Sequence, residues 1–166
     1  MILKKILQDS KKKESIGNKF RKKRFVYFER LISNLPRPIH ILDVGGTEDF
    51  WVNRGYNKKE DVKITLLNLK TIITNYNNIT SIVGDATDLS LFKEDHFDIV
   101  FDTVGLEATR KQAIRSIKPG GIIIHIGLTQ PGGNFDFRKT TLQEVTFIGT
   151  YCYTNKDFEK TLNILN

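Results

Sequence analysis

Short apolar runs recur along the chain at a length that suits buried strands. The first run, residues 39–44, carries Ile39, Ile41, Leu42 and Val44 and ends at a Gly-Gly pair. A run of this length, bounded by a turn signal, is typical of a strand in a parallel sheet. The predicted strands are 39–44, 62–69, 80–86, 97–101, 122–126 and 145–151.

Apolar residues at helical spacing lie between and before these runs. Residues 19–35 carry Phe20, Phe28 and Leu31 on one helical face, and Pro36 ends the helix. We expect this amphipathic helix to pack against the sheet. The segment 127–137 contains Gly and Pro and is predicted to be a loop. The other predicted helices are 48–54, 106–117 and 157–165.

Strands that alternate with helices form parallel sheets, because each crossover covers one face of the sheet. The predicted fold class is therefore α/β, a doubly wound, Rossmann-like parallel sheet in the order 3-2-1-4-5-6 with helices on both faces. We expect a single such domain over residues 19–166, preceded by a basic, flexible arm over residues 1–18. The sixth strand would form an edge through which chains could associate.

Positive charge is concentrated near the N-terminus. The formal net charge is +7, and residues 1–30 hold eleven Lys or Arg against three Asp or Glu. A basic arm can contact phosphates or an anionic membrane, but a solvated tail is the more common role and no base-reading motif accompanies it, so nucleic acid is not expected as a partner. The single cysteine, Cys152, excludes an intramolecular disulfide. No apolar run reaches the roughly 20 residues of a membrane span, and we expect a cytoplasmic protein.

The segment 43–47, Asp-Val-Gly-Gly-Thr, is the first candidate for chemistry. Glycines let backbone N–H groups approach a nucleotide-like ligand, and an acid at a strand end can accept hydrogen bonds. A plain strand-to-helix turn is an equally good interpretation of these residues alone. The dinucleotide fingerprint G-x-G-x-x-G is not met, because Gly45 and Gly46 are adjacent and no third glycine follows.

The same segment resembles motif I of class I S-adenosylmethionine-dependent methyltransferases, in which an acid precedes Gly-x-Gly. Thr47 stands where the second glycine is expected, although Gly-Gly-Thr followed by Phe-Trp resembles one branch of that family. The resemblance covers about residues 15–101. It implies that the cofactor binds Asp43, Gly45, Gly46 and Thr47 at its amino-acid end, Asn68 and Leu69 at its ribose, and Asp85 and Ala86 at its adenine.

Several of these residues have a simpler interpretation as well. Asn68 replaces the acid expected at the ribose, so it lacks a charge-assisted hydrogen bond. Asp85 would equally well cap the turn at Asp88. Asp102, after the fourth strand, is a candidate contact for the cofactor and equally a turn carboxylate. We count it among the cofactor-binding candidates and assign no catalytic residue.

From residue 97 onward the chain resembles another family, the medium-chain zinc-type alcohol dehydrogenases. This resemblance implies that Gly105, Gly127 and Leu128 form the wall near the nicotinamide of NAD(P). The matching stretches are 101–105, 113–121, 122–127, 144–149 and 151–158.

The two resemblances meet in the fourth strand, which suggests a chimera with a methyltransferase-like half (19–101) and a dehydrogenase-like half (102–166). Both families use right-handed crossovers, so such a hybrid would fold. In zinc-type dehydrogenases the zinc ligands lie mainly in a separate domain that has no counterpart here. The three histidines, His40, His96 and His125, have no zinc spacing. We therefore expect no metal site and no hydride transfer.

The predicted function is binding of S-adenosylmethionine, with methyltransferase activity on a small-molecule acceptor that the foreign second half would impair. Methyl transfer depends on in-line approach more than on a strong acid or base, so the lack of a catalytic dyad is no obstacle. The alternatives are a non-catalytic hybrid scaffold and an NAD(P)-binding remnant of a zinc-type alcohol dehydrogenase.

Overall fold

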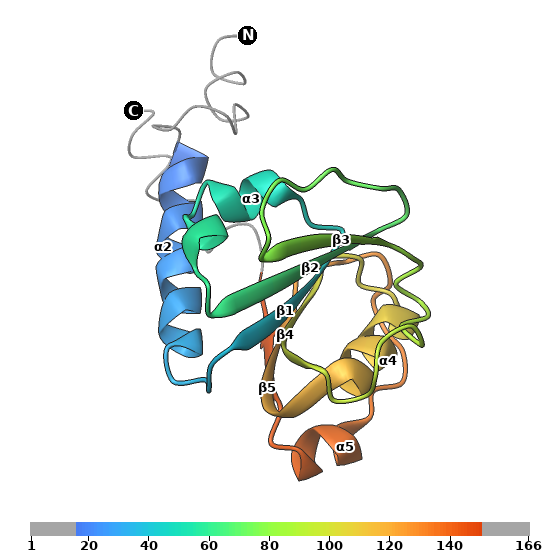
Figure 1. Cartoon of the computed structure of the whole chain (residues 1–166). Coiled ribbons are helices and arrows are strands. Elements are labelled where there is room, and N and C mark those ends of the chain that lie inside the picture. Colours follow the sequence, from blue (N-terminus) through green and yellow to red (C-terminus); the bar gives the residue numbers. More distant parts are fainter. Residues whose placement is uncertain (1–15, 151–166) are drawn as a thin grey trace, which may run out of the picture. The chain divides into compact units, whose positions relative to one another are not determined.

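Six parallel strands form one sheet in the order β3-β2-β1-β4-β5-β6 (Figure 1). This order confirms the predicted fold class. The computed structural model describes residues 16–150, so Cys152 and the predicted helix 157–165 lie outside the described residues. The strands are β1 (Ile39–Val44), β2 (Val62–Asn68), β3 (Ile79–Val83), β4 (Phe97–Asp102), β5 (Ile117–His125) and β6 (Thr146–Gly149).

The chain divides into two compact units, and the sheet belongs to the unit that spans residues 36–150. The other unit includes helix α2 (Ile16–Ile32), which corresponds to the predicted helix 19–35. Of the predicted arm 1–18, only the last three residues are described, and they begin α2. The packing of this helix and the single-domain boundary at residue 19 stay predictions.

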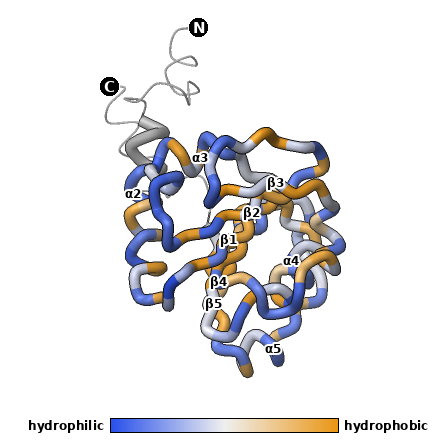
Figure 2. The backbone as a smooth tube through the Cα atoms, viewed as in Figure 1, coloured by the Kyte–Doolittle hydropathy of each residue, from blue (hydrophilic) through white to orange (hydrophobic). Residues whose placement is uncertain are grey.

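Helices cover both faces of the central strands, which makes those strands suitable for uniformly apolar side chains. On one face, Trp51 of α3 meets the ring of Phe101 edge-on, with the ring centroids 5.6 Å apart. On the other face, Ile114 of α4 joins Val100 and Ile123 in a buried cluster. Figure 2 shows the hydrophobic strands at the centre of this unit. Its helices are α3 (Glu48–Val52), the short 3-10 helix η1 (Tyr56–Lys58), α4 (Glu107–Ser116) and α5 (Phe137–Leu142).

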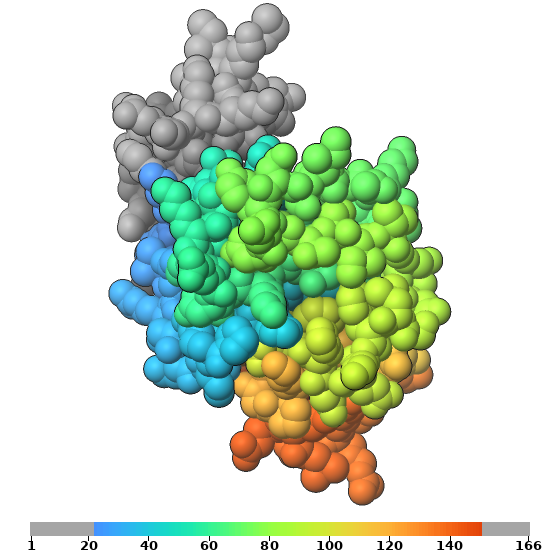
Figure 3. Space-filling view, in the orientation of Figure 1, coloured from blue at the N-terminus to red at the C-terminus, as the bar shows by residue number. Residues whose placement is uncertain are grey.

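Two crossovers differ from the alternation of strand and helix. Residues 69–78 and 84–96 connect β2 to β3 and β3 to β4 without a helix. The side-chain amide of Asn78 fixes the first connection by donating to three backbone oxygens at 2.8 to 3.1 Å. These oxygens belong to residues 56, 59 and 62, so the amide ties the end of the connection to the segment that leads into β2. The surfaces of the two connections adjoin one another in Figure 3.

The second half of the sheet also departs from the prediction in two places. β5 begins at Ile117 rather than at residue 122, because Ile117 pairs with Phe97 ahead of an irregularity in the register. Helix α5 is absent from the prediction. Its apolar residues Phe137 and Leu142 are largely exposed, so no buried face marks the helix in the sequence. A hydrogen bond from the Lys139 backbone N–H to the Asp136 side chain, 2.8 Å long, caps its first turn.

Strand β6 is the last strand of the described sheet and pairs only with β5 among the described strands. Association of chains through this edge stays a prediction. Among residues 16–150, no helix has the length and hydropathy needed to cross a membrane.

Candidate functional site

The carboxyl ends of β1, β2 and β4 meet at the Gly45 turn. The Gly45 N–H donates to the Leu67 oxygen at 2.9 Å, and the Thr103 hydroxyl donates to the Val44 oxygen. Gly45 has a φ of +80°, which L side chains rarely adopt. A Cβ at this position would also lie 2.7 Å from the Thr103 Oγ1. The turn therefore requires glycine at position 45. The sequence of residues 43–47 indicates the same position, as a glycine that would let the backbone approach a ligand.

Gly46 lies between the two polar side chains that the sequence selects nearby. The Asn68 side-chain amide donates to the Gly46 oxygen at 3.0 Å. A Cβ on Gly46 would be only 1.9 Å from Asp43 Oδ2, so the backbone passes directly against that carboxylate. Four of the predicted site residues are thus brought together: Asp43, Gly45, Gly46 and Asn68. Thr47 follows them as the exposed N-cap of α3, and its side chain makes no capping hydrogen bond.

Asp43 faces the protein interior. Its side chain is buried and Oδ2 accepts a 2.8 Å hydrogen bond from Trp51 Nε1. Burial raises the pKa of Asp43 to about 6, and the Trp51 hydrogen bond opposes part of that increase. Trp51 in turn packs against the rings of Tyr56 and Phe101. Asp43 therefore supports the glycine turn from the α3 side of the sheet.

The predicted adenine contacts lie on the connection after β3. Asp85 is exposed, and its Oδ1 accepts the Thr87 N–H at 2.8 Å. This hydrogen bond lowers the pKa of Asp85. The carboxylate thus caps the turn at Thr87, whereas the Asp88 N–H named by the simpler interpretation bonds to the backbone oxygen of Asp85. Ala86 packs partly against the core. Leu69, the second predicted ribose contact, is largely exposed after β2.

Glu48 is a polar residue of this region that the motif comparison misses. Its two carboxylate oxygens accept hydrogen bonds from the backbone and side chain of Asn75, at 2.7 and 3.1 Å. The contact joins the first turn of α3 to the connection 69–78. No local sequence signal pairs two residues this far apart, so only the folded chain reveals it.

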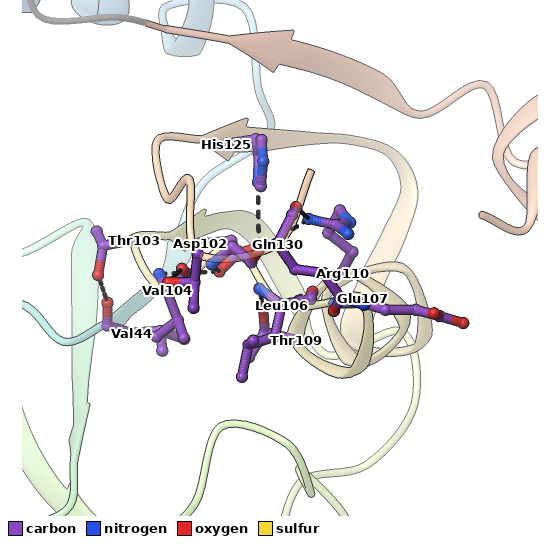
Figure 4. Close-up of polar contacts among 12 residues, drawn as sticks. Val44, Asp102, Thr103, Val104, Leu106, Glu107, Thr109, Arg110, His125 and Gln130 are labelled. Atoms are coloured by element: carbon purple, nitrogen blue, oxygen red, sulfur yellow. Dashed lines mark hydrogen bonds and ion pairs between the residues drawn. The ribbon is translucent and has the colours of Figure 1, made fainter. Parts of the chain in front are cut away.

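Asp102 forms the centre of a second polar cluster on the α4 side of the sheet (Figure 4). Its Oδ1 accepts the N–H groups of Val104 and Gly105 at 3.1 and 2.9 Å. Its Oδ2 lies 3.1 Å from His125 Nδ1. The backbone oxygen of Asp102 accepts two more N–H groups, from the first two residues after β5. Asp102 therefore faces away from Asp43, and both of its side-chain oxygens are occupied within the protein.

The turns after β4 and β5 touch through glycine backbone. A Cβ on Gly105 would lie 2.2 Å from the Gly127 carbonyl, and one on Gly127 would lie 2.2 Å from the Val104 carbonyl carbon. The two turns thus form a closely packed backbone wall, beside which Leu128 is largely exposed. This wall contains the residues that the dehydrogenase resemblance places near the nicotinamide.

The remaining histidines lie at the opposite side of the sheet, where the strands have their amino ends. The rings of His40 and His96 are 5.5 Å apart, and the His40 backbone N–H donates to Asp98. Burial, and then the nearby Lys118, lowers the pKa of His40. Among residues 16–150, no three His, Cys, Asp or Glu side chains gather closely enough to hold a metal ion.

Comparison with known proteins defines the class. A family model described as zinc-binding dehydrogenase matches residues 63–166, which is more than half of the chain. The chain belongs to this family. The match begins in β2 and so includes residues on both sides of the fourth strand, where the sequence suggests a junction.

Individual relatives match smaller shares of sequence. Sorbitol dehydrogenase 1 of Saccharomyces cerevisiae is 25% identical over 71 residues, which are 43% of this chain and 20% of that protein. Acetophenone reductase of Geotrichum candidum, solved in complex with NAD, is 18% identical with a TM-score of 0.55, over 90% of this chain and 41% of that chain. A Galdieria sulphuraria protein described as a sarcosine dimethylglycine methyltransferase is 18% identical with a TM-score of 0.50, over 66% of this chain and 48% of that chain.

These structural likenesses concern the fold, since their sequence identities are low. The chain spans about a fifth of the sorbitol dehydrogenase and less than half of each of the two solved structures.

The buried position of Asp43 predicts a specific pH dependence. Its folded pKa of about 6 exceeds the ordinary value of 3.8. Between these pH values the folded state binds more protons than the unfolded state, so the free energy of unfolding falls as pH rises. The loss is on the order of 3 kcal/mol and is complete above the folded pKa. Asp43→Asn keeps an acceptor for Trp51 and should remove this term, as urea denaturation between pH 4 and pH 7 would measure.

Trp51→Phe serves as the matched variant. This substitution removes the hydrogen bond that opposes the increase in the pKa of Asp43. The loss of stability should therefore extend to higher pH, as circular dichroism would measure. A difference in stability between wild type and Asp43→Asn that stays constant with pH would contradict the assigned burial of this carboxyl group.

The wall at Gly127 can be tested with alanine. Gly127→Ala places a methyl group against the Val104 backbone and should lower the free energy of unfolding by about 2 kcal/mol or more. In the control variant Gly132→Ala, the new Cβ meets no described atom within 4 Å. That variant should stay within about 0.5 kcal/mol of wild type. Equal urea midpoints for the two variants would show that the turns after β4 and β5 are not packed together.

Proposed function

We propose that the unit spanning residues 36–150 binds NAD(P)(H) at the carboxyl edge of its sheet, as the nucleotide-binding region of a zinc-type dehydrogenase. The observation that carries the proposal is the backbone wall at Gly105 and Gly127, which lies within the residues that match the family. Ligands of doubly wound sheets bind beyond the carboxyl ends of the strands, where the strand order reverses. Here that point lies between β1 and β4.

Two parts of the edge fit a dinucleotide. A wall of glycine backbone lets a planar ring approach without contact with side chains. At the other end, Asn68 lies at the end of β2 with its amide nitrogen on Gly46 and its amide oxygen available as an acceptor for a ribose hydroxyl. In such a complex the wall would hold the nicotinamide and Asn68 the adenosine ribose.

The first turn of α3 fits a dinucleotide less well. Glu48 and Asp49 are acidic residues in this turn, where doubly wound folds commonly hold a pyrophosphate. Negative side chains there repel phosphates. The proposal therefore includes weak binding, limited by the phosphate contacts.

S-adenosylmethionine is a second candidate because of these same acids. A positively charged amino-acid end would be attracted to the first turn of α3, whereas a pyrophosphate would be repelled. The arrangement of Asp43, Gly45 and Gly46 also resembles methyltransferase motif I. A hybrid with an impaired methyltransferase activity remains part of this second candidate, and its methyl acceptor would be a small molecule.

Parallel calorimetric titrations with NADH and with S-adenosylhomocysteine distinguish the two candidates. We expect NADH to bind, in the range of tens to hundreds of micromolar, and S-adenosylhomocysteine to bind more weakly. Binding of S-adenosylhomocysteine alone would replace the first candidate with the second. Binding of neither would contradict both.

The acidic turn gives a further test by charge removal. Asp49→Asn should tighten NADH binding about two- to fivefold at low salt, because one negative charge near the phosphates is lost. Asp61→Asn is the matched control, since Asp61 immediately precedes β2 at the opposite edge of the sheet and pairs with Arg37 at 3.1 Å. Equal NADH affinities for the two variants would place the phosphates away from α3.

A further inference from the structure

The buried Asp102 and the partly exposed His125 form an acid–imidazole pair that the proposed function does not use. Their side chains are 2% and 17% exposed, and His125 Nδ1 lies 3.1 Å from Asp102 Oδ2. Because Asp102 Oδ1 already accepts two backbone N–H groups, the carboxylate is held in one orientation. A carboxylate only accepts hydrogen bonds, so Nδ1 carries a hydrogen, and in the neutral imidazole Nε2 is left as an acceptor.

The Nε2 atom is accessible. No described residue donates a hydrogen bond to it, and His125 lines a groove of about 640 Å³. No side-chain atom of His125 is among the fully buried polar atoms without a hydrogen-bond partner in the described part of the chain, so its Nε2 is not fully buried. An acceptor with a fixed tautomer therefore faces a space large enough for a small ligand.

Three phenylalanines, Phe135, Phe137 and Phe147, line the groove beside His125. The ring of Phe147 lies beside His125 with centroids 5.7 Å apart, and Phe135 meets Phe147 edge-on at 5.1 Å. Phe137 and Leu128 extend the apolar lining. Such walls favour a planar apolar ring, through burial and through offset or edge-on ring contacts.

The rim of the groove is held in place by Arg110. Its guanidinium group donates to the backbone oxygens of Gly105, Gln130 and Gly132. These bonds fix the loop after β5 against the start of α4, as Figure 4 shows for Arg110 and Gln130. The groove is thus formed before any ligand arrives, which lowers the entropic cost of binding.

We propose that this groove is a binding site for a phenol, with its ring between the aromatic walls and its hydroxyl group donating to His125 Nε2. A hydroxyl supplies the donor that Nε2 lacks, whereas an aromatic hydrocarbon supplies none. An aromatic carboxylate would bring a second acceptor to Nε2 and be repelled. The groove shares Gly127 and Leu128 with the wall proposed for the nicotinamide, so phenol binding is tested without nucleotide.

The test uses 4-fluorophenol as the probe and the full chain, followed by fluorine NMR. We expect saturable binding to wild type, and about tenfold weaker binding of fluorobenzene and 4-fluorobenzoate. His125→Phe keeps a ring against Phe147 but removes the acceptor, so it should weaken binding of 4-fluorophenol about tenfold and leave fluorobenzene unchanged. His96→Phe, at the amino edge of the sheet, is the control and should bind as wild type does.

A second variant and a spectrum keep the test decisive if His125→Phe does not fold. Gly149 is the register neighbour of His125 on β6, and a Cβ there meets no described atom within 4 Å. Gly149→Leu should fill the space beside His125 and abolish binding. Long-range proton–nitrogen NMR should show Nδ1–H on His125. Equal binding of 4-fluorophenol and fluorobenzene, binding unaffected by either substitution, no saturation, or an Nε2–H tautomer would each overturn the proposal.

Discussion

The buried carboxylate of Asp102 holds together the turns at the carboxyl ends of β4 and β5. A charge removed from water is tolerated only where hydrogen bonds replace its hydration. Here the two side-chain oxygens face the turn after β4 and the imidazole of His125, while the backbone oxygen holds the turn after β5. The two turns are thereby fixed against each other so closely that Gly105 and Gly127 leave no room for a Cβ.

A second buried acid, Asp43, has a different role on the opposite face. Its hydrogen bond comes from Trp51, and burial raises its pKa to about 6. Asp102 instead receives several hydrogen bonds. The sheet separates the two carboxyl groups, although β1 and β4 are neighbours, because successive side chains of a strand point to opposite faces. The two carboxyl groups therefore lie in different environments at the carboxyl ends of the strands. Asp43 is buried beneath the glycine turn, and Asp102 lies beside the groove.

Membership of the zinc-binding dehydrogenase family and the acidic first turn of α3 point to different ligands. The wall after β4 and β5 suits a planar ring, while Glu48 and Asp49 suit a positive charge better than a phosphate. Both can occur in one domain because each turn at the carboxyl edge is an independent segment on a shared sheet. A fold of this kind constrains where a ligand binds more than which ligand it is.

The sequence by itself determined the sheet. Apolar runs of strand length, separated by turn residues, specify the six strands, and right-handed crossovers restrict their order to a few arrangements, one of which is 3-2-1-4-5-6. It also selected the glycine turn at Gly45 and Gly46, which is readable because it depends on residue type within a short segment. The wall at Gly105 and Gly127 was implied only by the resemblance to zinc-type dehydrogenases. Helix α5 was not readable, because its apolar residues are exposed.

Only the tertiary structure decided which polar groups meet. The hydrogen bonds of Asp43 with Trp51, of Glu48 with Asn75, and of Asp102 with His125 join residues of separate elements. The sequence places Asp43 and Asp102 in one candidate site, whereas the register and the strand pleat turn them to opposite faces. The physical reason is that a side chain's direction and burial depend on neighbouring strands and helices, and these neighbours are set by long-range packing that no local pattern records.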